Sequence, residues 1–344
     1  MEMLKNIPLA PLTTLGVGGT GKYFVRVSSE DDLKEAFYWA ESAGEKVFVL
    51  GGGSNILVSD SGFDGVVIKM EIAGVQLGSE DSSVTVTAGA GEDWDRFVES
   101  CVSKGLAGIE CLSGIPGTVG GTPIQNVGAY GQEVSETIVS VRCFDRKERK
   151  LVELSNKDCG FEYRKSILNT TNLDRYVVLS VVYRLTRGGE PKIVYKDLVE
   201  RLGRVRPTLE GAREAVLSIR RSKSMVIDTG DPNSRSAGSF FKNPIIESSL
   251  ADQILKGVDS DWVPRFVAAD QKVKIPAAWL IERAGFQKGY VLGNAGISRN
   301  HSLALINRGN ASASDIVALK NLIQKTVFDK FGIELQPEPI FVGF

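Results

Sequence analysis

The chain has 344 residues, 24% of them charged and 42% hydrophobic, and its 41 Lys and Arg nearly balance its 42 Asp and Glu, which gives a net charge of −1. At ~150 residues per domain this length indicates about two domains, and the composition excludes a disordered chain. The near-neutral charge argues against a nucleic-acid-binding protein. No apolar run approaches the ~18 residues of a membrane span, and the N-terminus lacks the apolar core of a secretory signal. We therefore expect a soluble, cytoplasmic protein without a membrane partner.

The scarce residue types limit the possible chemistry. His301 is the only histidine, which excludes a site with two histidine ligands or a pair of histidine acid–base groups, and we interpret it as a structural residue. The four cysteines have spacings that fit no zinc or iron–sulfur pattern, so we expect reduced thiols and no metal site. They are Cys101, Cys111, Cys143 and Cys159.

Strands and helices alternate in the predicted first part of the chain. Ser29 is a suitable N-cap, and an apolar face that includes Leu33, Ala36 and Phe37 predicts a helix over 29–43. A second helix is predicted over 92–104. Strands are predicted at 22–27, 46–50, 56–59, 66–70, 83–88, 138–145 and 177–185. This order is typical of an α+β flavin- or nucleotide-binding domain reaching to about residue 190.

The second part of the chain predicts helices at 247–256, 276–284 and 314–331. The last is the clearest, because its apolar residues recur at helical spacing behind a Ser312–Asp315 capping box. A basic segment, 201–223, precedes these helices, and two interpretations of it stay open: the solvated face of an amphipathic helix, or contact with a pyrophosphate. Its basic residues are Arg201, Arg204, Arg206, Arg213, Arg220, Arg221 and Lys223.

Three glycines match the spacing of a dinucleotide-binding fingerprint. They are Gly16, Gly18 and Gly21. That fingerprint needs a strand before it and a helix after it, so that the pyrophosphate meets a helix N-terminus. Here a proline-containing extended segment precedes the glycines and a predicted strand follows them. We therefore reject a Rossmann fold.

A run of three glycines, 51–53, directly follows the predicted strand at 46–50. Successive glycines let backbone N–H groups approach an anion closely, as in phosphate-binding nests. Ser54 and Asn55 add side-chain donors. A tight turn between strands is the alternative, and the run alone does not decide between the two.

Residues 113–131 contain six glycines and two prolines in nineteen residues. So long a glycine-rich segment inside a compact domain is usually functional, and its donors suit a large phosphorylated cofactor. A mobile surface loop fits poorly, because Ile115 and Val119 would be exposed. The side-chain donors are Ser113, Thr118, Thr122, Gln125 and Asn126.

Seven motifs follow one another along the chain. They are LGGGSN (50–55), TAGAGEDW (87–94), SGIPGTVGGTPIQNVGAYG (113–131), FEYRKSI (161–167), AGSFFKNP (237–244), PAAWLIERAGFQKG (276–289) and LQPEPIFVG (335–343). In these motifs and their order the chain resembles, from about residue 13 to 343, the UDP-N-acetylenolpyruvoylglucosamine reductase family, the bacterial enzymes that make UDP-N-acetylmuramate for peptidoglycan.

The resemblance implies an α+β fold with a two-lobed FAD-binding domain of the vanillyl-alcohol-oxidase (PCMH) type at 1–190, whose lobes divide near residue 70. A substrate-binding domain follows at 191–344, and packing of its last strand (339–343) back on the FAD domain stays open. The FAD is expected to be non-covalent. Its implied contacts are Gly51, Gly52, Gly53, Ser54, Asn55, Gly89, Gly91, Ser113, Ile115, Pro116, Gly117, Thr118, Gly120, Gly121, Gln125, Asn126, Gly128, Ala129 and Tyr130.

Three catalytic residues are implied by the same resemblance. Ser239 matches the serine that protonates the intermediate, and Arg164 and Glu338 match the pair that flanks the enolpyruvyl carboxylate. Gln336 stands where many relatives have glutamate, but the neighbouring Glu338 is kept. The implied substrate-binding residues are Tyr130, Tyr195, Lys223 and Asn243, and Tyr195 points to the longer form of the family.

The implied enzyme is an NADPH-dependent UDP-N-acetylmuramate dehydrogenase that acts on UDP-N-acetylglucosamine enolpyruvate, in peptidoglycan synthesis and hence in cell division and cell shape, with no obligate protein partner. An FAD-dependent alcohol or lactone oxidase of the same flavin fold is the alternative. Many such oxidases hold FAD through a histidine, which the flavin domain lacks here. A third hypothesis is a flavin- or sugar-nucleotide-binding protein without catalysis.

Overall fold

The structure is a computed structural model of the 344-residue chain, and it describes all residues except 1, 80–82, 204–205, 258–263 and 269. Contacts divide the chain into two compact units, each built from three segments. The first unit consists of Met1–Ile7, Gly21–Gly53 and Phe63–Val226, and the second of Pro8–Thr20, Ser54–Gly62 and Ile227–Phe344. Residues 191–226 therefore pack with the first unit. The functional division at residue 190 stays a prediction.

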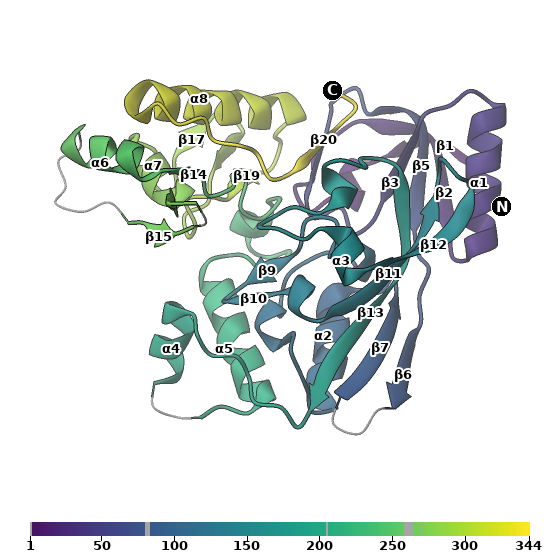
Figure 1. Cartoon of the computed structure of the whole chain (residues 1–344). Coiled ribbons are helices and arrows are strands. Elements are labelled where there is room, and N and C mark those ends of the chain that lie inside the picture. The colour runs from purple at the N-terminus through teal and green to yellow at the C-terminus, as the bar shows by residue number, and fades with distance from the viewer. Residues whose placement is uncertain (1, 80–82, 204–205, 258–263, 269) are drawn as a thin grey trace. The chain divides into compact units, whose positions relative to one another are not determined.

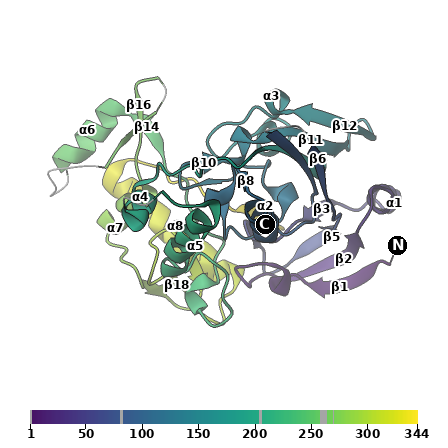
Figure 2. The same ribbon diagram turned by 90° about the horizontal axis from the view of Figure 1, so that it is seen from below.

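One sheet of the first unit has its neighbouring strands β2, β5 and β3 in parallel (Figure 2). Helix α1 (Glu30–Ser42) contacts β5 through the face that contains Leu33 and Ala36, and its Ser29 side chain accepts a hydrogen bond from the Asp32 amide, as predicted. The strand order is β1 (Leu4–Pro8), β2 (Thr20–Val27), β5 (Phe63–Met70) and β3 (Val47–Leu50).

The second sheet of this unit is antiparallel, and the long strand β13 is central to it (Figure 1). Tyr183 of β13 is fully buried against Trp94 and Phe97 of α2 (Trp94–Ser103), which covers one face of the sheet. The strand order is β12 (Lys150–Ser155), β11 (Ile138–Asp145), β13 (Tyr176–Arg187), β7 (Ser83–Gly89) and β6 (Val75–Ser79), and β8 (Leu106–Ala107) also pairs with β13.

The last two helices of the first unit, α4 (Lys196–Leu202) and α5 (Leu209–Ser222), pack against each other (Figure 2). Residues 201–202 and 209–222 of the basic segment are thus helical, but the segment is not simply a solvated face, because Arg213 and Arg220 are buried. Arg204 lies outside the described residues. The short elements of this unit are α3 (Asn156–Cys159), β9 (Gly128–Ala129), β10 (Gln132–Glu133), η2 (Glu110–Leu112), η3 (Val119–Gly121), η4 (Val134–Glu136) and η5 (Ile167–Asn169).

The second unit packs helix α8 (Ala313–Phe331) against the sheet of β17 (Val291–Leu292), β18 (Ala295–Ile297) and β19 (Leu305–Asn307) (Figure 1). Ser312 and Asp315 form the predicted capping box, and Gly332 ends α8 in a left-handed conformation. The other elements are η1 (Ala10–Leu12), β4 (Ile56–Val58), η6 (Pro232–Ser234), β14 (Ile245–Glu247), α6 (Ser248–Gly257), β15 (Phe266–Val267), β16 (Lys272–Lys274), α7 (Ala277–Arg283) and β20 (Ile340–Val342).

These elements confirm the α+β fold class. β2 begins directly after the Gly16–Gly19 turn and no helix follows there, which agrees with the rejection of a Rossmann fold. β20 pairs in parallel with β4, so the last strand returns to residues 56–58. The four cysteines are buried and unbridged, as expected. In the described parts of the chain, no helix is both long and apolar enough to cross a membrane.

Candidate functional site

Two glycine-containing loops of the first unit meet at a close backbone contact. Gly51–Gly53 follow the carboxyl end of β3, and a Cβ atom placed on Gly52 would lie 2.5 Å from the Gly117 Cα. Gly53 and Gly117 have φ angles of +67° and +127°, which favour glycine. We call residues 51–53 together with 117–118 the glycine cradle.

The backbone amides of the cradle are available to a ligand. Among the residues that the structure describes, the N–H groups of Gly52, Gly53, Gly117 and Thr118 donate to no protein acceptor. Buried or half-buried N–H groups without an acceptor are costly unless water or a ligand satisfies them. Several such groups in one place form an anion site, so the residues present fit the diphosphate of a dinucleotide.

The glycine-rich segment around the cradle is packed rather than mobile. Val119 is fully buried, and Ile115, Ile124, Val127 and Ala129 pack against the main core of the first unit. The structure therefore excludes the loose-loop alternative. The same core contacts fix the position of the cradle residues that follow Ile115.

Several glycines of this region are required by protein packing. A Cβ atom on Gly89 would lie 2.4 Å from the Ile72 carbonyl oxygen, and one on Gly91 or Gly120 would lie 2.6 Å from a neighbouring backbone or side-chain atom. Only at Gly121 would a Cβ atom meet no protein atom within 4 Å among these four positions. The expected FAD contacts of these residues stay predictions, but their packing role alone accounts for glycine at three of them.

Three of the side-chain donors of residues 113–131 make hydrogen bonds within the protein. The Ser113 hydroxyl donates to the Glu110 carbonyl at 2.7 Å. Thr122 bonds the buried Tyr183 hydroxyl at 2.8 Å, and the Asn126 amide donates to Glu133. These contacts shape the segment, and direct cofactor contacts by these side chains stay predictions.

Arg164 lies in a tight turn that docks on the glycine-rich segment. Its φ angle is +56°, and its Nη2 donates to the Gly128 carbonyl at 2.7 Å. Two residues later, the Ser166 hydroxyl donates to the Ile124 carbonyl at 2.7 Å. The turn therefore holds the guanidinium group beside the segment predicted to bind the cofactor.

Tyr130 and Tyr195 meet edge to face, with ring centroids 5.4 Å apart. Lys223, at the end of α5, pairs with Asp197 at 2.7 Å. The predicted substrate-binding residues of the first unit thus gather where α4, α5 and the glycine-rich segment meet. Burial raises the pKa of the Tyr130 hydroxyl, which therefore stays protonated at neutral pH.

Arg220 is a residue of this region that sequence reasoning did not single out. It is 7% exposed, its Nη2 donates to the Met225 carbonyl at 2.7 Å, and within the described residues its buried Nε has no hydrogen-bond partner. A Cβ atom on Gly114 would lie 3.3 Å from this Nε. An unsatisfied buried donor marks a position where a polar ligand or a water is needed.

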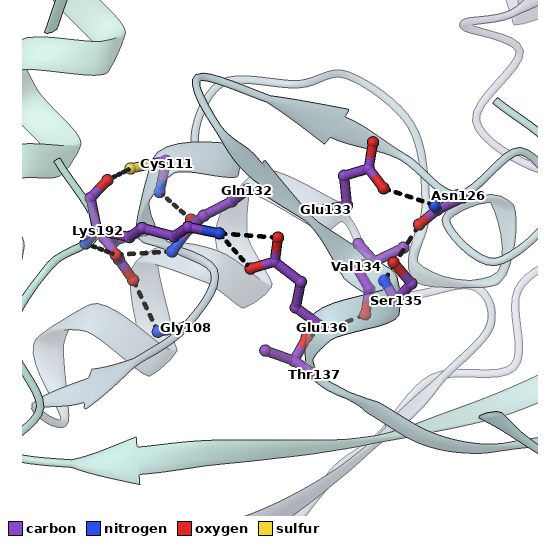
Figure 3. Close-up of polar contacts among 11 residues, drawn as sticks. Gly108, Cys111, Asn126, Gln132, Glu133, Val134, Ser135, Glu136, Thr137 and Lys192 are labelled. Atoms are coloured by element: carbon purple, nitrogen blue, oxygen red, sulfur yellow. Dashed lines mark hydrogen bonds and ion pairs between the residues drawn. The ribbon is translucent and has the colours of Figure 1, made fainter. Parts of the chain in front are cut away.

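A buried carboxylate, that of Glu110, connects Gly108, Gln132 and Lys192, which are labelled in Figure 3. Glu110 is fully buried and accepts hydrogen bonds from the Gly108 amide (2.7 Å), the Gln132 side chain (2.7 Å) and the Lys192 amide (2.9 Å). Gln132 in turn accepts from the Cys111 amide at 2.7 Å. This cluster connects the loop after β8 with β10 and with the chain leading to Tyr195.

Ser239 and Glu338 belong to adjacent segments of the second unit. Phe241 and Pro337 form an antiparallel bridge, and the Glu338 amide donates to the Phe240 carbonyl at 2.9 Å. The Asn55 side chain donates to the Glu338 carbonyl at 3.3 Å, so it supports the same segment. The structure therefore brings these two predicted catalytic residues together, whereas Arg164 belongs to the first unit and is described there.

The Ser239 hydroxyl lies 3.3 Å from His301 Nε2. We interpreted His301 from the sequence as a structural residue, and its 62-residue separation from Ser239 gave no signal of this contact. Asn243, expected near the substrate, accepts a hydrogen bond from the Ala277 amide at the start of α7 at 2.9 Å. Within the described residues, no group of three His, Cys, Asp or Glu side chains could hold a metal ion.

Two family models match the two parts of the chain. An FAD binding domain matches residues 21–155, and the C-terminal domain of UDP-N-acetylenolpyruvoylglucosamine reductase matches residues 231–342. The first match covers most of the first unit, including the glycine cradle. The second covers Ser239, His301 and Glu338.

Curated relatives match along the whole chain. The UDP-N-acetylenolpyruvoylglucosamine reductases of Thermobifida fusca and Saccharopolyspora erythraea are 46% and 44% identical, over 98% and 97% of this chain and 98% and 94% of theirs. The crystal structure of the corresponding reductase from Thermus caldophilus matches with a TM-score of 0.66 and 25% identity, over 99% of this chain and 98% of that chain. The chain therefore belongs to the UDP-N-acetylenolpyruvoylglucosamine reductase family.

Proposed function

We propose that this protein reduces the enolpyruvyl group of UDP-N-acetylglucosamine enolpyruvate to the lactyl ether and so forms UDP-N-acetylmuramate, with FAD as cofactor and NADPH as electron donor. The observation that carries the proposal is the close placement of Ser239, His301 and the Glu338 segment in a chain 46% identical to a reductase of this name. FAD, when bound, supplies the hydride. The roles of the protein side chains follow from what the substrate needs.

The substrate first needs its carboxylate stabilised. Hydride addition at the terminal carbon of the enolpyruvyl double bond moves negative charge onto the carboxylate end, as an enediolate. Arg164 is suited to this charge, because a guanidinium group stays protonated and binds a carboxylate through two parallel hydrogen bonds. Its turn is fixed by the bonds to Gly128 and Ile124, so little reorganisation is needed on binding.

The enediolate then needs a proton on one face of its central carbon. Ser239 is a sufficient donor because a strongly basic acceptor can take a proton from a weak acid. Its neighbour His301, 3.3 Å away, orients the hydroxyl. Together the hydride and this proton complete addition across the double bond. For Glu338 two roles remain: polarising the substrate carboxylate or orienting a water.

Binding of the UDP-sugar is assigned to Tyr130, Tyr195, Lys223 and Asn243. Lys223 carries a charge suited to a diphosphate, and its pair with Asp197 holds the side chain in place. Burial is the largest single influence and lowers the pKa of Lys223, but the hydrogen bond to Asp197 and the attraction of Asp197, Tyr130 and Tyr195 together raise the net pKa, so the lysine stays charged at neutral pH.

The test is an anaerobic absorption experiment on the purified holoenzyme. We expect flavin bands that bleach on addition of NADPH and return when UDP-N-acetylglucosamine enolpyruvate is added. NADH in a parallel sample measures the preference between the two dinucleotides. A protein that gains no flavin bands with added FAD would overturn the proposal. Bands that return only when oxygen is admitted would favour the oxidase alternative.

A further inference from the structure

A lysine lies directly beside the glycine cradle. Lys69 is the residue before the last in β5, paired in register with Leu50 of β3, and its Nζ donates a hydrogen bond to the carbonyl oxygen of Gly51. β3 and β5 are parallel, so their carboxyl ends share one edge of the sheet. Ligands of open α/β sheets bind outside this edge.

Lys69 forms no close ion pair with the residues that the structure describes. It is half-buried and no carboxylate among them lies within 4 Å of it, in contrast to Arg26 on β2, which pairs with Glu71. Burial lowers the pKa of Lys69, and the attraction of the more distant Glu71 offsets this only in part. A nearby anionic ligand would remove this penalty.

The hydrogen bond from Lys69 also determines where the next amide points. The Gly51–Gly52 peptide is trans, so its C=O and N–H point in opposite directions. With the carbonyl held by Lys69, the Gly52 N–H is directed away from the lysine, and it has no acceptor among the described residues. Without this contact, two consecutive glycines would leave the peptide free to rotate.

We propose that Lys69 is a positioning residue for the FAD diphosphate: it fixes the Gly51–Gly52 peptide so that the cradle amides face the anion, and from the other side of that peptide its positive charge adds a longer-range attraction to the anion. The proposal rests on FAD binding by the first unit. It concerns affinity for the phosphorylated part of the cofactor and not the reduction step.

The test compares FAD with riboflavin, which lacks both phosphates, in titrations of the flavin-free full-length protein followed by flavin fluorescence. For Lys69→Met we expect the FAD dissociation constant to rise about 10- to 100-fold, the effect of one charge-assisted hydrogen bond, with riboflavin binding unchanged. Lys69→Arg should retain affinity close to wild type. Lys69→Gln keeps a hydrogen-bond donor without the charge. Its FAD dissociation constant should lie between those of Lys69→Arg and Lys69→Met, and its FAD binding should depend less on salt concentration than that of the wild type.

Lys46→Met is the matched control. Lys46 is an exposed lysine just before the amino end of β3, so its substitution removes the same charge beside the same sheet. It should bind both flavins as wild type does. Equal weakening of FAD and riboflavin in Lys69→Met would overturn the proposal in favour of a general structural role, and so would wild-type FAD affinity in that variant. Failure of the wild-type protein to bind FAD would instead overturn the proposed function.

Discussion

The glycine cradle of the first unit and the Ser239 segment of the second unit are candidate sites that offer different parts of the residue to a ligand. In the cradle the available groups are backbone amides, and at Gly52 there is no room for a side chain. In the Ser239 segment the backbone is satisfied by pairing with residues 336–338, and the side chains are available for chemistry. The first type of site is damaged by adding an atom, and the second by removing one.

Removing the Ser239 hydroxyl is the strongest test of this contrast. In Ser239→Ala we expect flavin reduction by NADPH to be unchanged and reoxidation by the enolpyruvyl substrate to slow by about 10²-fold or more, the range of a lost general acid. Stopped-flow absorbance separates the two half-reactions. Ser61→Ala removes an exposed hydroxyl of the same unit and should change neither. Unchanged rates for both half-reactions in Ser239→Ala would refute its assigned role.

Adding one methyl group to the cradle is the converse test. In Gly52→Ala the new Cβ atom would lie 2.5 Å from Gly117 Cα, so the two loops must separate. Loss of two hydrogen bonds from backbone amides to a charged ligand predicts that FAD binds about 100-fold more weakly. Titration of the flavin-free protein with FAD measures this affinity. Gly211→Ala in α5 is the control, because its nearest contact is 3.4 Å. Wild-type FAD affinity in Gly52→Ala would contradict a backbone site.

The stability of the first unit is expected to depend on a buried side chain behind its loops, Glu110. Glu110→Gln places a donor where the buried carboxylate accepts three hydrogen bonds, and we expect the free energy of unfolding to fall by about 2 kcal/mol. Glu136→Gln breaks only the exposed pair with Lys192 and should cost less than about 0.5 kcal/mol. Urea denaturation measures both, and equal values would show that Glu110 is not structurally special.

The smallest expected effect is at His301. Its contact with Ser239 is a single side-chain hydrogen bond at 3.3 Å, so His301→Ala should slow only the substrate half-reaction, by about fivefold, which corresponds to about 1 kcal/mol. His301→Gln, which can restore a polar contact, should recover part of this loss. A slower flavin reduction by NADPH in either variant would show that His301 acts on more than the Ser239 hydroxyl.

Local patterns were enough to predict the helices with clear signals at their ends. α1 and α8 begin at Ser29 and Ser312, whose caps are encoded within four residues. β6 was not predicted, because it is an edge strand whose Val75 and Leu77 are exposed, so it has no buried face to leave a pattern. The ends of α4 and α5 were also not predicted within the basic segment.

In the candidate site, too, some residues could be predicted from local sequence patterns and others could not. The glycine run and the glycine-rich segment indicated the cradle, because a backbone site requires glycine in the sequence itself. Ser239, Arg164 and Glu338 came only from the family resemblance, since a single serine, arginine or glutamate carries no local signal. The contacts of His301 with Ser239 and of Lys69 with Gly51 depend on pairings 62 and 18 residues apart, which no local pattern encodes.

The pairing of β20 with β4 has a consequence for the synthesis of the chain. Residues 56–58 leave the ribosome long before their partner strand, residues 340–342, is made. β4 therefore lacks its partner strand β20 while nearly three hundred further residues are translated. The first unit, by contrast, ends at Val226 and can assemble before residues 340–342 are made.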